Sequence, residues 1–332
     1  LSDGIRLWLR GTKYQKKELN NVPVNELTRI DTCWTGTMLA ARHMLEGGFF
    51  TLRFMRLALA AGEENRICRA LVLMTPPLLY RQVPNVAAAN KLYHQAKTLA
   101  EELNNPYARA LVSLVRGHTE SVCGNWRNSL SLAEEGEALL RQRCTGVQFE
   151  VATNLHAQIV SLFFLGELNE LSRRVNRTVA ETQQENGWHA AMTAKSFLGS
   201  SAWLKDDNVE LARVHAADIE QMLDRGFDRL HYCELIGSAH IDLYCGAASQ
   251  AYERLEHSWK QAVPRIGMVD PTYRVLLHHL RARAALGCLS RGSDDRKLHR
   301  VARRDGKGLC RDWQQWARPL GQLVLAGLAA VQ

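Results

Sequence analysis

Apolar residues recur at helical spacing along most of the chain. Two such stripes are Leu92, Ala96, Leu99 and Leu103, and Leu168, Leu171, Val175 and Val179. Apolar positions three or four residues apart line one face of an α-helix. No segment alternates between apolar and polar residues for long enough to indicate a β-strand. The pattern therefore predicts an all-α protein.

Helix-breaking residues divide the chain at regular intervals. One series consists of Gly48, Pro84, Gly124, Gly166, Asp206, Gly246 and Gly287, and a second consists of Gly62, Asn105, Gly146, Gly187, Gly226 and Gly267. The two series interleave, so each unit contains two helices and two turns. A period of about 40 residues is typical of helical repeat proteins, and it predicts an α-solenoid of helix-turn-helix repeats.

Small residues follow several of the turns at matching positions. The pairs are Ala89 and Ala96, Ser129 and Gly136, and Ala251 and Ser258. Small side chains allow consecutive helices to approach closely. The arrangement is similar to a degenerate tetratricopeptide (TPR) unit, although the usual period of that unit is shorter, at about 34 residues. A stack of such units leaves a concave groove, in which we expect a protein or peptide partner.

The repeats do not extend over the whole chain. Residues 1–24 form a basic lead-in, interpreted as a linker or a truncated helix, before a first helix near Val24 to Glu46. The predicted solenoid covers residues 25–289. Residues 290–332 form a basic segment followed by C-terminal capping helices. Because the chain begins with Leu1, we expect a fragment of a larger protein or a separately encoded descendant of one.

Composition is ordinary for a folded protein, with 46% hydrophobic and 23% charged residues. Eight cysteines are spread through apolar stretches without a Cys-x-x-Cys pair, which favours buried free thiols in a reducing compartment. The apolar run from Leu320 to Val331 is shorter than the roughly 20 residues that a membrane span needs. We therefore expect a cytoplasmic protein with no membrane partner.

Positive charge is concentrated near the C-terminus. The formal net charge of +8 comes from 42 basic and 34 acidic residues, a mild excess. The segment Arg281 to Arg311 is the best candidate for contact with a polyanion such as nucleic acid. Its candidate contact residues are Arg291, Arg296, Lys297, Arg300, Arg303, Arg304 and Lys307. The alternative, which we favour, is a solvated charged face on a polar cap of the solenoid.

No pattern of catalytic, cofactor-binding or metal-binding residues is present. Gly306-Lys307-Gly308 lacks the other positions of a phosphate-binding loop, and the kinase motifs are missing. His278 and His279 are adjacent, so we expect one to line the core and the other to face water. His231, Cys233 and Glu234 lie together near a helix start, but adjacency on a helix does not provide the geometry of a nucleophile and its base. The sequence predicts neither an enzyme nor a cofactor.

Four short phrases carry a family resemblance: Arg29 to Trp34 (RIDTCW), Leu57 to Glu63 (LALAAGE), Leu139 to Gly146 (LLRQRCTG) and Ile241 to Tyr244 (IDLY). Together they resemble the C-terminal region of large bacterial serine/threonine protein kinases. In that family a kinase domain and an ATPase module precede a helical, TPR-like tail. The resemblance extends from about Arg6 to Leu289. The kinase and ATPase parts are absent here, so none of their catalytic residues can be transferred.

The resemblance implies a regulatory or protein-binding tail in a signalling protein. Its partners would include the kinase and ATPase domains of the parent. The alternative is a helical repeat protein that binds nucleic acid through the segment Arg281 to Arg311, with nucleic acid the less favoured partner. A third hypothesis is an enzyme whose site is assembled across repeats, although no spacing in the sequence requires one.

Overall fold

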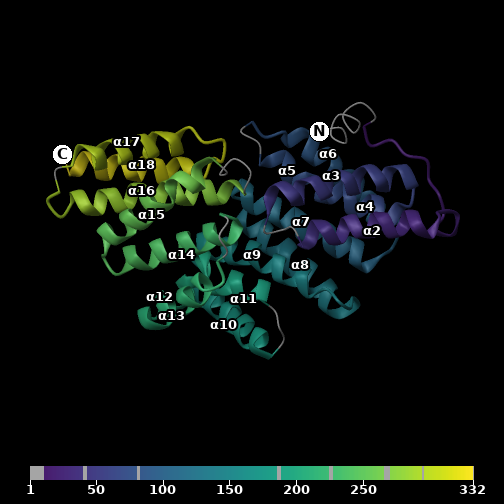
Figure 1. The fold of residues 1–332 in the computed structure, drawn as a ribbon, viewed down its shortest axis with the longest axis horizontal. Helices are drawn as coiled ribbons and strands as arrows, with labels where there is room; N and C mark the ends of the chain where they lie inside the picture. The colour runs from purple at the N-terminus through teal and green to yellow at the C-terminus, as the bar shows by residue number, and fades with distance from the viewer. Residues whose placement is uncertain are drawn as a thin grey trace. The chain divides into compact units, whose positions relative to one another are not determined.

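Every regular element of the described chain is helical. The computed structural model describes residues 11–39, 43–80, 83–184, 188–223, 227–264, 270–293 and 295–331, and these ranges contain no β-strand (Figure 1). The all-α prediction is confirmed. The chain divides into two compact units: unit 1 comprises Leu1–Thr119 and Ser131–Asn154, and unit 2 comprises Glu120–Leu130 and Leu155–Gln332.

Helices of unit 1 pack mainly against their neighbours in the sequence. Its elements are a short 3-10 helix η1 (Leu19–Asn21), α2 (Val24–Leu39), α3 (Met44–Ala61), α4 (Glu64–Leu73), α5 (Thr75–Leu79) and α6 (Val86–Glu102). Helix α2 packs on α3, α3 on α4, and both α4 and α5 on α6. Phe54, Ile67 and Ala96 are completely buried in this core.

Three helices contribute residues to both units: α7 (Pro106–Cys123), α8 (Trp126–Arg143) and α9 (Gln148–Leu165). Unit 2 continues with α10 (Leu168–Gln184), α11 (Trp188–Lys195), η3 (Phe197–Ser200), α12 (Ser201–Leu204), α13 (Val209–Glu220), α14 (Arg229–Tyr244), α15 (Ala248–Ala262), α16 (Pro271–Leu289), α17 (Arg296–Cys310) and α18 (Ala317–Ala330). From α13 to α18, each helix packs on the next one. In addition, α14 contacts α16, and α16 contacts α18.

Several predicted breaks are helix ends. Gly62, Gly124, Gly146, Gly166 and Gly246 all have positive φ at the turn that follows a helix. At Gly62 the requirement is strict, because φ is 79° and a Cβ atom would lie 2.0 Å from the carbonyl oxygen of Gln15. Glycine is the residue that adopts this left-handed conformation without steric cost.

Other predicted breaks are wrong. Gly48 lies inside α3 and Gly287 lies inside α16, because a glycine in a helix reduces stability only modestly and neighbouring residues carry the helix through it. The helix predicted from Val24 to Glu46 is also two helices, with α2 ending at Leu39. Gly187, Gly226 and Gly267 lie outside the described residues.

The described part of the basic lead-in, from Gly11 onward, packs within unit 1. The amide of Lys17 donates to the carbonyl of Gly62 at 2.9 Å, and Lys16 Nζ lies 2.7 Å from a carboxylate oxygen of Glu64. The segment is therefore attached at the turn between α3 and α4. Residues 1–10 lie outside the described ranges.

Small residues lie where helices approach closely, as the repeat pattern predicts. Ala96 and Ala251 are fully buried, and the hydroxyl of Ser129 accepts a hydrogen bond from that of Ser161 at 2.9 Å. A Cβ atom on Gly136 would lie 3.2 Å from the carbonyl oxygen of Ala110. Larger side chains at these positions would separate the helices.

The hairpin of α17 and α18 has the closest of these approaches. A Cβ atom on Gly321 would lie 2.6 Å from the carbonyl oxygen of Gly306 and 2.8 Å from both the amide nitrogen and the Sγ of Cys310. These are mainly backbone atoms, which cannot rotate away. The absence of a side chain at Gly321 therefore sets the distance between the two helices.

We expect Gly321→Ala to destabilise the protein by about 1–3 kcal/mol, because the added methyl group would force α17 and α18 apart. Gly308→Ala is the matched control on α17: no atom lies within 4 Å of its added Cβ. This control should be neutral or stabilising by up to about 1 kcal/mol, since alanine favours helix. Urea denaturation of both variants measures the difference, and equal stabilities would contradict the close approach.

Candidate functional site

Helix α17 has one buried face and one cationic face. Leu298, Val301, Ala302 and Leu309 are buried against the rest of unit 2. The helix begins after Asp295, whose Oδ1 accepts a hydrogen bond from the amide of Lys297 at 2.7 Å. This cap and the apolar face fix both where the helix starts and which side points outward.

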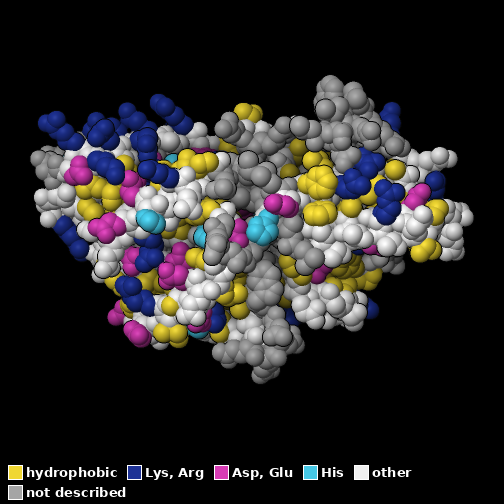
Figure 2. Space-filling view, in the orientation of Figure 1, with side chains coloured by type: hydrophobic (Ala, Val, Ile, Leu, Met, Phe, Trp, Pro, Cys, Tyr) yellow, Lys and Arg dark blue, Asp and Glu magenta, His cyan; other side chains and the backbone are white. Residues whose placement is uncertain are grey.

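Six of the seven predicted contact residues come together on the outer face of α17. They are Arg296, Lys297, Arg300, Arg303, Arg304 and Lys307, and all six are exposed. Figure 2 shows Lys and Arg side chains gathered at the upper left, over α17. We call these six residues the basic face. From Arg296 to Lys307 it extends about 16 Å along the helix.

Arg291 is not part of the basic face. It is exposed in the turn after α16, with its guanidinium beside the backbone of Gly246. The six candidate residues on α17 therefore share one surface, and Arg291 lies outside it.

Arg281, the first residue of the segment, is unable to contact a partner because it is only 1% exposed. Its Nε and Nη2 atoms donate to the two carboxylate oxygens of Asp305 at 2.7 and 2.8 Å. Nη1 lies 3.2 Å from Glu256, and the guanidinium stacks 3.2 Å from the ring centroid of Trp259. Arg281, which opens the candidate segment but was not among its candidate contact residues, therefore belongs to the core.

The two carboxylates that follow the start of α17, one in the helix and one in the turn after it, are both paired with arginines of α16. From Arg296 to Gln332 the only acidic residues are Asp305 and Asp312. Asp305 binds Arg281, and Asp312 accepts from Arg274 Nη2 at 2.9 Å, so that α16 supplies both partners. Burial opposes the ionisation of Asp305, but hydrogen bonds from His278 and Arg281 outweigh it and hold its pKa below the usual value.

The basic face consequently keeps most of its charge. Lys297 lies 2.8 Å from Glu256 and Arg304 lies 3.5 Å from Asp305, both along the edge nearest α15 and α16. Arg296, Arg300, Arg303 and Lys307 form no ion pair with another described residue. These four residues follow one another at intervals of four, three and four positions, which keeps them on one side of the helix.

The residues His231, Cys233 and Glu234 do not converge on a common point. His231 forms a capping box with Asp228 at the start of α14, and its Nδ1 accepts from the Asp228 amide at 3.2 Å. Cys233 is buried, 3.4 Å from the hydroxyl of Tyr273. Burial raises the pKa of the Cys233 thiol and also that of Glu234, which opposes ionisation of both groups.

The adjacent histidines are both partly buried, which differs from the prediction that one would face water. His278 lies 3.1 Å from Asp305 and contacts Trp259, whereas His279 points toward His240 of α14. Burial lowers the pKa of His240 and of His279 to about 4. Among the described residues, no group of three or more His, Cys, Asp or Glu side chains could hold a metal ion.

The cysteines are free throughout the described chain, as predicted, but their burial varies. Cys33, Cys68, Cys233 and Cys288 are buried. Cys245 is exposed, which contradicts the prediction that the thiols are buried. Its nearest polar partner is Arg213, at 3.7 Å.

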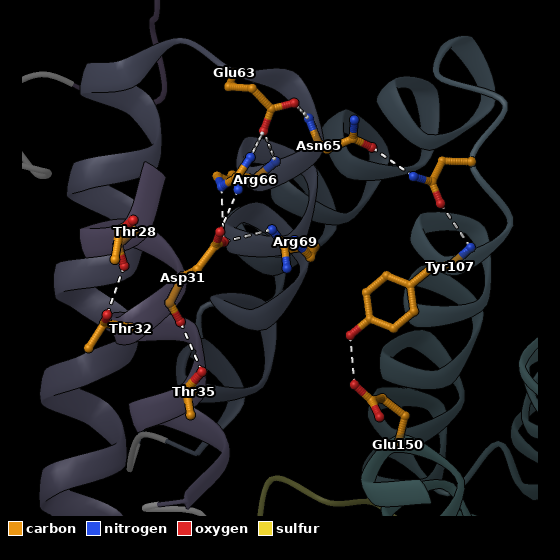
Figure 3. A network of polar contacts seen from close by, with 11 residues as sticks. Thr28, Asp31, Thr32, Thr35, Glu63, Asn65, Arg66, Arg69, Tyr107 and Glu150 are labelled. Atoms are coloured by element: carbon orange, nitrogen blue, oxygen red, sulfur yellow. Dashed lines mark hydrogen bonds and ion pairs between the residues drawn. The ribbon is translucent and has the colours of Figure 1, made fainter. Parts of the chain in front are cut away.

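A polar network in unit 1 involves residues of the phrases that carry the family resemblance (Figure 3). Asp31 of α2 accepts from Arg66 Nε at 2.9 Å and from Arg69 at 3.3 Å. Glu63 caps α4 by accepting from the amides of Asn65 and Arg66. These contacts join α2 to the start of α4.

The same network continues toward α9. Asn105 joins Asn65 to the amide of Tyr107, and the Tyr107 hydroxyl donates to Glu150 at 2.7 Å. Burial and the nearby Glu150 carboxylate raise the pKa of Tyr107. The side chains in Figure 3 thus join helices of unit 1 to one another.

No protein-family model, curated protein or solved structure matches this chain. The resemblance to the tails of bacterial kinases therefore stays a prediction. No described helix combines the length and apolar character needed to cross a membrane.

We expect Arg281→Met to destabilise the protein by about 3–5 kcal/mol, because it leaves the buried carboxylate of Asp305 without its main partner. The double variant Arg281→Met/Asp305→Leu should recover most of this loss, since no buried charge remains. Denaturant unfolding of the single and double variants provides the measurement. A double variant no more stable than Arg281→Met would show that the ion pair is not the cause.

We expect acid to destabilise unit 2 through His240 and His279. Their folded-state pKa values of about 4 lie below the ordinary 6.5. Protonation therefore favours the unfolded chain, and stability is lost as the pH falls from 6.5 toward 4. Replacing both by asparagine should flatten the dependence of the melting temperature on pH between 6.5 and 5. Replacing the exposed His94 should not change it.

Proposed function

We propose that this chain is a non-catalytic scaffold that binds other proteins through a stack of degenerate TPR-like hairpins with a period of about 40 residues. Three features support the stack: helices that pack on their neighbours in sequence, glycine turns at the predicted spacing, and small residues at the close approaches. Nearest-neighbour packing of this kind is typical of solenoids.

The observation that carries a binding function is the basic face of α17. Four of its cations have no ionic partner among the described residues, and the two carboxylates between Arg296 and Gln332, Asp305 and Asp312, are bound by Arg281 and Arg274 of α16. Like charges held side by side on one helix reduce its stability. An acidic partner would relieve this repulsion.

Catalysis has less support, because the candidate nucleophile and acids take part in packing. Cys233 is buried against Tyr273, and His231 caps α14. Each of these contacts accounts for the residue without a reaction. We therefore propose binding rather than turnover.

The resemblance to bacterial kinase tails extends the proposal to a signalling role. On this hypothesis the chain is cytoplasmic and its partners include the kinase and ATPase domains of a parent protein. Nucleic acid is the second candidate partner, and the basic face is the observation that favours it.

The test is affinity capture with the full chain as bait in a lysate of the source organism, treated with nuclease, at low and moderate salt. We expect a discrete protein that remains bound under both conditions and is identified by mass spectrometry. Capture of no protein would contradict the scaffold. Capture of nucleic acid alone, without nuclease and only at low salt, would favour the second candidate.

A further inference from the structure

We infer that the basic face of α17, together with the exposed side of α18, binds an acidic amphipathic helix of a protein partner. The inference rests on the proposed binding function and names both the site and the chemistry of the partner. It depends on four observations: the charge of the hairpin, the spacing of its cations, the character of α18, and the packing around α17.

The hairpin of α17 and α18 is strongly and uniformly cationic at its surface. Its cations are the six residues of the basic face together with Arg311 and Arg318. Asp305, the one acidic residue within these two helices, is 1% exposed. Beyond the exposed carboxylate of Asp295, which caps the start of α17, a partner approaching the hairpin meets no exposed carboxylate on these two helices. Such a surface attracts acidic partners and repels basic ones.

The spacing of the cations fits an α-helical partner. Arg296, Arg300, Arg303 and Lys307 lie about 6, 4.5 and 6 Å apart along the helix axis. Glutamates at intervals of four, three and four residues on a second helix are separated by the same distances along its axis. A partner helix lying along α17 could thus place one carboxylate opposite each cation, and arginine offers two donors to each.

Helix α18 supplies a second, uncharged contact beside the basic face. Apart from Arg318, its exposed side chains are Pro319, Gln322, Leu323, Ala326, Ala329 and Ala330. Leu323 is 67% exposed, and the alanines are small enough for another helix to approach closely. A helix with acidic residues on one side and apolar residues beside them would contact both α17 and α18.

Duplex nucleic acid fits this surface less well. An α-helix that reads DNA enters a major groove about 12 Å wide, whereas α17 is packed against both α16 and α18. The basic face also carries no aromatic or amide side chain that could stack on a base or read its edge. Only phosphate contacts would remain, and α18 would add Arg318 alone to them.

The experiment measures fluorescence anisotropy of a labelled peptide of about 20 residues, long enough to span the basic face. Its glutamates follow the intervals of four, three and four residues, with leucine and alanine beside them. A scrambled peptide of the same composition and a labelled DNA duplex serve as comparison probes. Each probe is titrated with the full chain at low and moderate salt.

We expect the patterned peptide to bind at least about tenfold more tightly than the scrambled one, since only the pattern aligns charges with the face. Arg300→Glu/Arg303→Glu should weaken binding at least about tenfold. The control Arg109→Glu/Arg127→Glu makes the same charge change at exposed positions on α7 and α8 and should leave affinity within about twofold. Circular dichroism verifies that both variants fold.

A charge-swapped peptide, with lysine in place of glutamate, should bind the Arg300→Glu/Arg303→Glu variant better than the wild-type chain. Equal binding of the patterned and scrambled peptides would overturn the inference, as would unchanged affinity of this variant. Tighter binding of the duplex, with a steep loss in salt, would overturn it in favour of nucleic acid. If lysate capture yields a protein whose binding is insensitive to the variant, the scaffold stands and this site does not.

Discussion

The buried ion pair between Arg281 of α16 and Asp305 of α17 fixes how α17 packs on α16. Removing two charges from water is costly, and the geometry must compensate for it. Here the carboxylate receives two hydrogen bonds from one guanidinium, which also stacks on Trp259 and reaches Glu256. Because Asp305 must face Arg281, the rotation of α17 about its axis is fixed. The basic residues on the opposite side of the helix are therefore held outward.

Ion pairs that are only partly buried join other helices in each unit. Asp31 of α2 meets Arg66 of α4 in unit 1, while Asp242 of α14 accepts from Arg254 of α15 at 3.1 Å in unit 2. Asp31 and Asp242 belong to the phrases that carry the family resemblance. Their role in this structure is to join helices that are close in sequence. The phrases are thus informative about packing, and they do not by themselves indicate a chemical activity.

Local features of the sequence predicted much of the fold. Glycine turns were identifiable because positive φ selects glycine, and Leu171 and Val175 are completely buried as their spacing predicts. Gly48 and Gly287 were misassigned because a glycine inside a helix has no local signal that distinguishes it from one at an end. The inward position of Asp305 was visible in its spacing from Leu298, Val301 and Leu309. The sequence did not show that Arg281 is the partner of Asp305, because their contact depends on how α16 packs against α17.

The net charge averages over the whole chain and so conceals how strongly the cations are concentrated near its C-terminus. The segment from Arg296 to Gln332 carries eight basic residues against two carboxylates, and hence most of the net charge of +8. At physiological ionic strength, charges are screened over about 8 Å, roughly half the length of the basic face. A partner at this surface therefore experiences the local cations much more strongly than distant carboxylates. A mild overall charge is therefore compatible with a strong local field. The field is preserved here because Arg274 and Arg281 bind Asp312 and Asp305, so that these carboxylates do not neutralise the cations of α17.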